Sequence, residues 1–437
     1  MYNSTNMIKF TASLRYSVMR SRNLSSKIEE LSGQLGSFPE YAKAQALKAE
    51  GSYKLAFPEL ERVYDVLSHS TGHASPMTLY VARQMSEAAQ LSGKTDKALD
   101  ILTSSLSHIP SDCPDKAALV ALRSYQCMVG GGSLKRSQED AEEAVRICES
   151  FEGMHPDYFG VSYGLMGVVC SLNDSNSGLA EEYLQLAARW SQEPIAELCA
   201  LNNLGHYHLY RREGGEEGGD FRMSVIKGKK LWGVSLSDEG GDASAEGETD
   251  LGEGRKEALA YWDEAIEAYK EEEDMLSNVH YAIAYAGVLA ASSQGVRTSD
   301  PSRSAELLAS ALKAIDGHKE DPRSRPMLGR ILSLIAFDNM SASMAVTAEG
   351  LFRSSLDHLG AASAHAAYDT RYRYEHALAL GGYSVLTSKW EKREQDAADL
   401  DKQSTGILKE LGQGEAAMDG LPGPFPFLFP DISATLI

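Results

Sequence analysis

The amino-acid sequence predicts an all-α fold, a right-handed α-solenoid of about seven to eight helical hairpins stacked in series. Three observations carry this prediction. Ala, Leu, Glu and Ser dominate a chain of 437 residues, a composition that favours helices. A small–bulky–small triplet recurs in helical spacing along most of the chain, and successive copies begin 42, 43, 39, 78, 46 and 44 residues apart. Gly and Pro also fall where hairpins of this length would turn.

The triplets mark the second, return helix of each expected hairpin. Small residues let two helix backbones approach closely, and the bulky residue between them fills the groove of a neighbouring helix. The seven triplets are Ala56/Leu60/Val63, Ala98/Leu102/Ser105, Ala141/Val145/Cys148, Ala180/Leu184/Ala187, Ala258/Trp262/Ala265, Ser304/Leu308/Ala311 and Ala348/Phe352/Ser355.

The first hairpins follow from these signals in chain order. We expect a helix within 31–56, a turn at Gly51, and a second helix over 58–67 with Pro58 in its first turn. The next hairpin is expected over 76–90 and 96–107, separated by Gly93. At the other end of the array, an eighth hairpin is expected over 368–386 and 389–411.

The anomalous spacing of 78 residues lies in the middle of the chain. Subtracting an insertion of about 40 residues restores the common period, so 200–208 and 258–266 are interpreted as the two helices of one hairpin. The repeats are therefore expected over 25–212 and 255–412, with an acidic, Gly-rich insertion at 213–254.

Several motifs resemble the tetratricopeptide repeat (TPR) superfamily, in the variety found in kinesin light chains. The motifs are Leu201-Asn202-Asn203-Leu204-Gly205, His155-Pro156-Asp157 and Ala348-Glu349-Gly350-Leu351-Phe352. The resemblance covers roughly 40–410 and is clear in three or four repeats. It implies that first helices line a concave groove, where Asn and basic side chains hold a peptide.

The positions that match such a groove are partner-binding candidates. An Asn side chain both donates and accepts hydrogen bonds, which suits recognition of a peptide backbone. The candidates are Asn202, Asn203, His206, Arg371 and Arg373, with Arg123 and Arg330 as further cations of first helices. A carboxylate clamp of the chaperone-binding kind is not recognisable. His206 and His208 lie two residues apart and point to different faces of a helix, which disfavours a shared metal.

Both ends of the chain differ from the repeats. Residues 1–24 contain four basic and no acidic residues, which resembles a mitochondrial presequence and would leave a mature charge of −24 from the total of −20. A basic tail is the alternative. Residues 413–437 are rich in Pro and Phe and are expected to be extended, either along the last helices or in a partner's groove.

Within the insertion lies a basic and hydrophobic island, 225–236. It is interpreted either as a docking segment or as a short strand or turn folded back on the solenoid. The residues that would dock are Lys227, Lys229, Lys230, Leu231 and Trp232.

Charge and motif content narrow the function. A net charge of −20 disfavours nucleic-acid binding, and no apolar stretch reaches the roughly 18 residues of a membrane span. The five cysteines lack a CxxC pair and are expected to be buried and reduced. Catalytic motifs and cofactor sites are not recognisable, and the Gly-rich turn at 130–132 lacks P-loop spacing.

We therefore expect a non-enzymatic protein scaffold, mitochondrial and on the matrix side, whose protein partner is basic or of mixed charge. It would act as an assembly or maturation factor, or as a peripheral subunit, of a large complex such as one of the respiratory chain. The alternatives are a cytosolic adaptor similar to kinesin light chain and, least favoured, an enzyme with a site on the solenoid.

Overall fold

The computed structural model describes residues 30–110, 113, 115–130, 132–151, 156–172, 177–212, 230–231, 234–235, 253–270, 273–297, 299–365 and 370–413. The expected presequence, the Pro- and Phe-rich tail beyond 413, and Lys227, Lys229 and Trp232 lie outside these ranges.

Eight helical hairpins follow one another in the described part of the chain, as the all-α solenoid prediction requires. Their helices are α2 (Pro39–Ala49) with α3 (Tyr53–Thr71), α4 (Pro76–Leu91) with α5 (Thr95–His108), α6 (Asp115–Val129) with α7 (Leu134–Ser150), α8 (Pro156–Leu172) with α9 (Ser177–Trp190), α10 (Pro194–Arg212) with α12 (Glu253–Tyr269), α13 (Val279–Val296) with α14 (Pro301–Asp316), α15 (Arg325–Ser341) with α16 (Ala345–His365), and α17 (Thr370–Ser388) with α18 (Glu394–Gln413). A short 3-10 helix, η2 (Glu273–Ser277), precedes α13.

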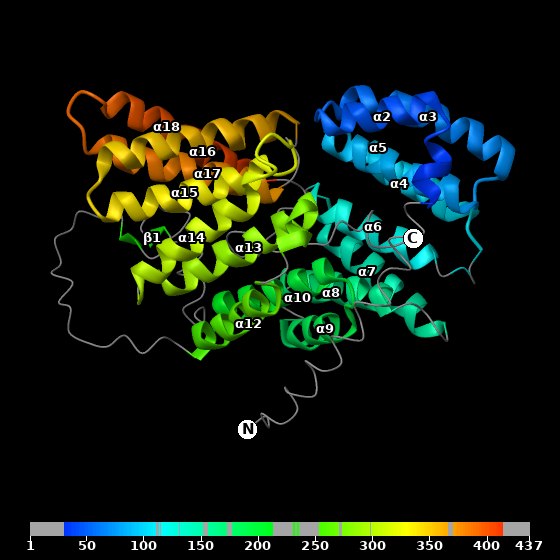
Figure 1. The fold of residues 1–437 in the computed structure, drawn as a ribbon, viewed down its shortest axis with the longest axis horizontal. Coiled ribbons are helices and arrows are strands. Elements are labelled where there is room, and N and C mark those ends of the chain that lie inside the picture. The colour runs from blue at the N-terminus through cyan, green and yellow to red at the C-terminus, as the bar shows by residue number, and fades with distance from the viewer. Residues whose placement is uncertain are drawn as a thin grey trace.

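Each hairpin packs on the next, so the fold is an all-α solenoid. The array curls strongly: Figure 1 shows the chain running from blue through cyan, green and yellow to orange, so that the first hairpins face the last ones. None of the described helices is long and apolar enough to cross a membrane.

The triplets do what their pattern predicts. All twenty-one side chains of the seven triplets are buried, with exposed fractions between 0% and 8%. Three of the bulky residues pack against glycines of first helices: a Cβ on Gly167 would meet Leu184, one on Gly205 would meet Trp262, and one on Gly382 would meet Phe337 and Phe352. In these three cases the bulky residue of a return helix lies where a first helix has no side chain.

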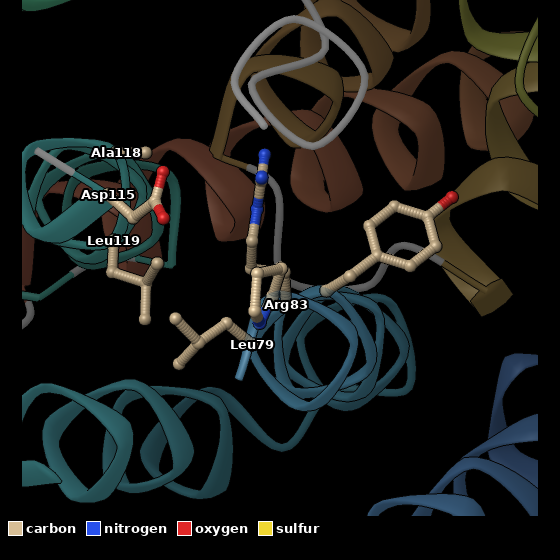
Figure 2. Close-up of a pocket in the computed structure, with 7 residues that line it drawn as sticks. Leu79, Arg83, Asp115, Ala118 and Leu119 are labelled. Atoms are coloured by element: carbon tan, nitrogen blue, oxygen red, sulfur yellow. The ribbon is translucent and has the colours of Figure 1, made fainter. Parts of the chain in front are cut away.

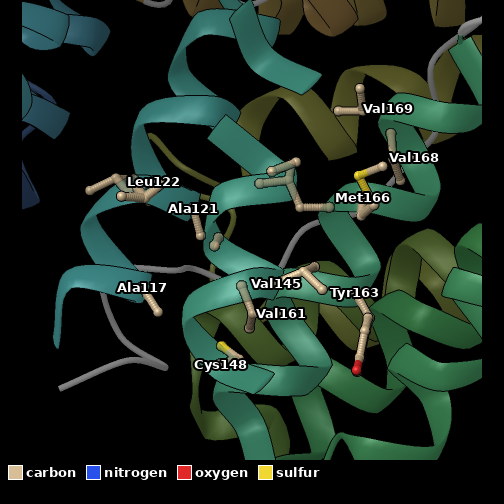
Figure 3. Packing of buried hydrophobic residues seen from close by; sticks show 14 of the residues in the cluster. Ala117, Ala121, Leu122, Val145, Cys148, Val161, Tyr163, Met166, Val168 and Val169 are labelled. Carbon is tan, nitrogen blue, oxygen red and sulfur yellow. The ribbon is translucent and has the colours of Figure 1, made fainter. Parts of the chain in front are cut away.

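The apolar interior is divided into four clusters along the array. Figure 3 shows part of the largest, where Ala121 of α6, Val145 of α7 and Val161 of α8 lie together. Leu204 and Tyr207 of α10 belong to this cluster, whereas Leu198 and Leu201 of the same helix belong to the next one. Helix α10 thus joins the two largest parts of the core. Cys127, Cys148, Cys170 and Cys199 are buried thiols, Cys113 is half-buried, and none of the five forms a disulfide.

Two predicted helices have wrong bounds: 58–67 is part of the longer α3 (Tyr53–Thr71), and the helix predicted from residue 389 begins at Glu394. Helix α3 begins at Tyr53, and Pro58 lies inside it rather than in its first turn. The reason lies upstream: α2 ends at Ala49 with Glu50 as its C-cap, Gly51 adopts the left-handed conformation (φ 74°), and the chain turns directly into α3 from there. The second hairpin was predicted within two residues at every end.

Candidate functional site at the central hairpin

The central hairpin consists of α10 and α12, which pack together across the insertion that separates them in sequence. Its centre is the Trp262 side chain, which is fully buried against Gly205. The indole Nε1 donates a hydrogen bond to the main-chain oxygen of Asn202, 3.3 Å away. A buried indole N–H needs such a partner, so this bond fixes the register of the two helices.

Asn202 and Asn203 are both buried, with exposed fractions of 0% and 2%. The side-chain Nδ2 of Asn202 donates to Oδ1 of Asn203 at 3.4 Å. Both amides are thus buried rather than exposed along a surface, and their role in partner binding stays a prediction. The motif identified α10 as the first helix of the hairpin, but both amide side chains of that helix lie in the interior.

His206 and His208 lie on different faces, as their spacing predicts. His206 is fully buried and makes an edge contact with the Trp262 ring, with centroids 5.1 Å apart. Burial holds the pKa of His206 well below its ordinary value, and the charge of Arg330 lowers it further. His206 is therefore a neutral imidazole at physiological pH. His208 stacks on Tyr261 and has its Nδ1 2.8 Å from Oε2 of Glu257 on α12.

A buried ion pair lies near His206. Arg330 of α15 has its Nε 3.3 Å from Oε1 of Glu375 on α17, and both side chains are buried. Burial raises the pKa of Glu375, and the Arg330 guanidinium opposes that rise. Arg330 was one of the predicted first-helix cations, whereas no signal in the sequence distinguished Glu375 from the solvated carboxylates around it.

Two other predicted cations bind carboxylates on the return helices of their own hairpins. Arg123 of α6 binds both carboxylate oxygens of Asp140 on α7, at 2.9 and 2.6 Å. Arg373 of α17 forms an ion pair with Glu410 of α18. The side chain of Arg371 lies outside the described atoms. The structure therefore brings Arg330 toward His206, whereas Arg123 and Arg373 pair with carboxylates of their own return helices. Arg123 also donates to the Thr103 hydroxyl of α5 at 3.4 Å.

The island in the insertion includes a small antiparallel ladder. Strand β1 (Lys230–Leu231) pairs with β2 (Val234–Ser235), with Lys230 opposite Ser235 and Leu231 opposite Val234. The main chain of Lys230 and Leu231 thus adopts the short-strand form that was one of the two interpretations.

Carboxyl groups that the sequence did not single out lie around the N-terminus of α10: Glu193 and Glu197 of that segment, and Asp157 of α8. Asp157 is buried and its Oδ1 accepts hydrogen bonds from the main-chain nitrogens of Gln192 and Glu193, at 2.6 and 3.0 Å. The Tyr269 hydroxyl donates to Oε2 of Glu197 at 2.5 Å. Burial raises the pKa of Glu197 to about 7, although the Tyr269 hydrogen bond opposes it. Burial and the neighbouring Asp157 raise the pKa of Glu193 to about 7.

A small pocket of about 20 Å³ lies between α4 and α6. Figure 2 shows Leu79 and Arg83 of α4 on one side of it and Asp115, Ala118 and Leu119 of α6 on the other. Asp115 accepts a hydrogen bond from the Tyr158 hydroxyl at 3.1 Å. In the part of the chain that the structure describes, no three His, Cys, Asp or Glu side chains gather as metal ligands would.

The chemistry of the central hairpin is that of packing: a shape-matched indole, buried amides and a neutral histidine hold inner helices together. A scan against protein-family models found none that matches the chain. A search of curated proteins found no significant match either.

Proposed function

We propose that this protein is a non-enzymatic scaffold of the tetratricopeptide-repeat kind, which holds protein partners on the surface of its solenoid. The observation that carries the proposal is the series of eight hairpins, each joined to the next through buried small and bulky residues. Such arrays present an extended surface whose shape is set by many small rotations, and proteins use it to bind other chains. The proposal of a tetratricopeptide-repeat scaffold rests on the architecture together with the motifs around 201–205 and 348–352.

The partner is a protein with a basic or mixed-charge surface. The chain carries a net charge of −20, and long-range attraction accelerates encounters between opposite charges. The acidic background also favours partners other than nucleic acid.

The scaffold acts in mitochondria, as an assembly factor or a peripheral subunit of a large complex. Support comes from residues 1–24, whose four basic residues and absence of acidic ones suit an import signal. Removing this segment would leave the eight hairpins intact, because the first of them begins at Pro39.

The test compares three full chains with a fluorescent tag at the C-terminus: wild type, a deletion of 1–24, and a variant with Arg15, Arg20 and Arg22 changed to Gln. We expect only the wild type in mitochondria, since the third protein keeps the length of the N-terminal segment but loses three of its four positive charges. Cytosolic wild type would overturn the import proposal and favour the adaptor similar to kinesin light chain.

Crosslinking mass spectrometry on intact organelles then tests the scaffold itself. We expect crosslinks from the tagged chain to a protein partner, absent from cells that express the deletion. A metal or nucleotide retained stoichiometrically by the purified protein, with no crosslinked partner, would favour an enzyme instead.

A further inference from the structure

Four aromatic side chains of α8 and α9 form a continuous series of stacked rings, which we call the aromatic row. The Phe159 ring stacks on Trp190, with centroids 4.8 Å apart, and on Tyr163, with centroids 6.0 Å apart. Tyr163 stacks in turn on Tyr183, with centroids 6.1 Å apart, and its hydroxyl donates to Oε1 of Glu149 on α7 at 3.1 Å. These contacts join the two helices and hold each ring in place before any ligand arrives.

The aromatic row lies partly on the surface, at the margin of the largest core cluster. Trp190 is 38% exposed, and Phe159 and Tyr183 are half-buried against that cluster. Figure 3 shows Tyr163 at the margin, with its hydroxyl directed away from the aliphatic side chains. Leu179 lies on the same face of α9, one turn before Tyr183, and is 47% exposed. Adjoining apolar groups of this kind, unlike scattered ones, mark a site of interaction.

Carboxylates surround the Tyr183 end of the row. Burial raises the pKa of Tyr183, and three nearby carboxylates raise it further. They are Glu149, Glu182 and Glu142. At the other end, the exposed Arg189 precedes Trp190. The charge around the row therefore favours a ligand that carries a cationic group at the end that meets Tyr183.

The dimensions of the row fit a short extended peptide. Leu179 and Trp190 are eleven residues apart on α9, which corresponds to about 16 Å along the helix axis. A polyproline II segment rises about 3.1 Å per residue, so about five residues cover this length. The carbonyl oxygens of such a segment have no internal hydrogen bonds, and the Trp190 indole and the Tyr183 hydroxyl are donors on the row. Aromatic surfaces bind proline-rich segments well, because these segments are already extended and lose little entropy.

We propose that the aromatic row is a docking surface for a proline-rich segment of a partner protein, with Lys or Arg next to its prolines. The prolines lie along Trp190, Phe159 and Tyr183, and the basic side chain meets the carboxylates at the Tyr183 end. This inference rests on the proposed scaffold function and specifies the chemistry of the partner. The Pro- and Phe-rich tail of the chain itself is the competing occupant. Residues 413–437 contain three acidic and no basic residues, so the carboxylates disfavour the tail.

The test measures binding of fluorescein-labelled peptides to the full chain by fluorescence anisotropy. The probe has two arginines followed by eight prolines. Two matched peptides replace the prolines with alanines or the arginines with glutamates, and a fourth has the sequence of residues 418–432. We expect the probe to bind at least tenfold more tightly than the other three peptides. No binding of the probe, or equal or tighter binding of any of the other three, would overturn the proposal.

Substitutions in the row locate the binding. Trp190→Ala should weaken binding of the probe at least tenfold, because it removes the most exposed ring of the row. Trp390→Ala is the matched control and should leave Kd unchanged, since Trp390 lies in the last hairpin, between α17 and α18. Leu179→Ala should weaken binding at least threefold and keeps the test valid if Trp190→Ala unfolds. Losses in Trp190→Ala and Leu179→Ala no larger than that in Trp390→Ala would sink the assignment to this row.

This docking site and the scaffold function can fail separately. Crosslinked partners in intact organelles, together with no binding of the probe by the purified chain, would overturn the docking site and leave the scaffold standing. Binding of the probe that depends on Trp190, with no crosslinked partner, would support the docking site and count against the scaffold.

Discussion

Burial decides the ionisation of individual side chains in the inner helices. His206 is kept neutral, while Glu193 and Glu197 have pKa values raised to about 7. The sequence could not predict this, because Glu197 has the same neighbours in sequence as many solvated glutamates. Only the fold places Tyr269 and the apolar residues of α12 around it. The same limit applied to Asn202 and Asn203, whose motif was recognisable but whose burial was not.

Glu197→Gln should stabilise the protein at alkaline pH. The folded pKa of about 7 lies above the ordinary value of 4.5, so the folded state holds a proton that the unfolded state has lost. The contribution of Glu197 to stability is therefore present below about pH 4.5 and declines as pH rises to about 7. Relative to wild type, the variant should gain up to about 3 kcal/mol in unfolding free energy between pH 5 and pH 8.

Denaturant titrations at both pH values measure this difference. Glu267→Gln, an exposed position on the same helix as Tyr269, is the control and should give no pH-dependent gain. A constant offset between Glu197→Gln and wild type at the two pH values would contradict a raised pKa.

Some neighbouring helices pack through a bulky residue on one and a glycine on the other, and the sequence reveals only one side of this contact. The triplets predicted the buried face of seven of the eight return helices, because their spacing is local and regular. Their glycine partners were not predicted, since Gly167 and Leu184 lie 17 residues apart whereas Gly205 and Trp262 lie 57 apart. Tertiary contact, not local spacing, selects those glycines. The start of α3 was missed for a related reason, as the turn at Gly51 outweighs the usual preference of Pro58 for a first turn.

Gly205→Ala should lower the free energy of unfolding by about 1–3 kcal/mol, because the new methyl group overlaps the buried Trp262 indole. This loss outweighs the gain in helix propensity. Gly164→Ala is the control: its Cβ would make an ordinary 3.5 Å contact with Ala187, so it should be neutral or stabilising by up to about 1 kcal/mol. Thermal melts of the two variants check the contrast, and equal melting temperatures would contradict the Gly205–Trp262 fit.

The molecule as a whole is a series of coupled cores. The repeat period predicted the number of hairpins and their order, and the structure agrees. The period could not predict that the first hairpin returns to the seventh, because that closure depends on a few contacts such as Gly51 with Pro322. Small rotations between repeats accumulate to produce it, and no single motif records them.

Stability should vary along this series. Terminal hairpins have one sequential neighbour, and α2 and α3 contribute core residues to one small cluster, whereas α10 joins the two largest clusters. We expect amide hydrogens of α8 and α10 to exchange at least tenfold more slowly than those of α2, α3 and α18. Hydrogen exchange followed by mass spectrometry measures this gradient, and uniform protection would show that the array unfolds as one unit.

The break within the central hairpin also has a consequence in time. When the chain is made from its N-terminus, α9 follows α8 almost at once, but 40 residues separate the end of α10 from the start of α12. At typical synthesis rates that separation lasts about 2–8 s, during which Gly205 has no indole to receive. The first four hairpins can therefore complete their packing before the fifth is able to close, and the second half of the array is built onto a finished first half.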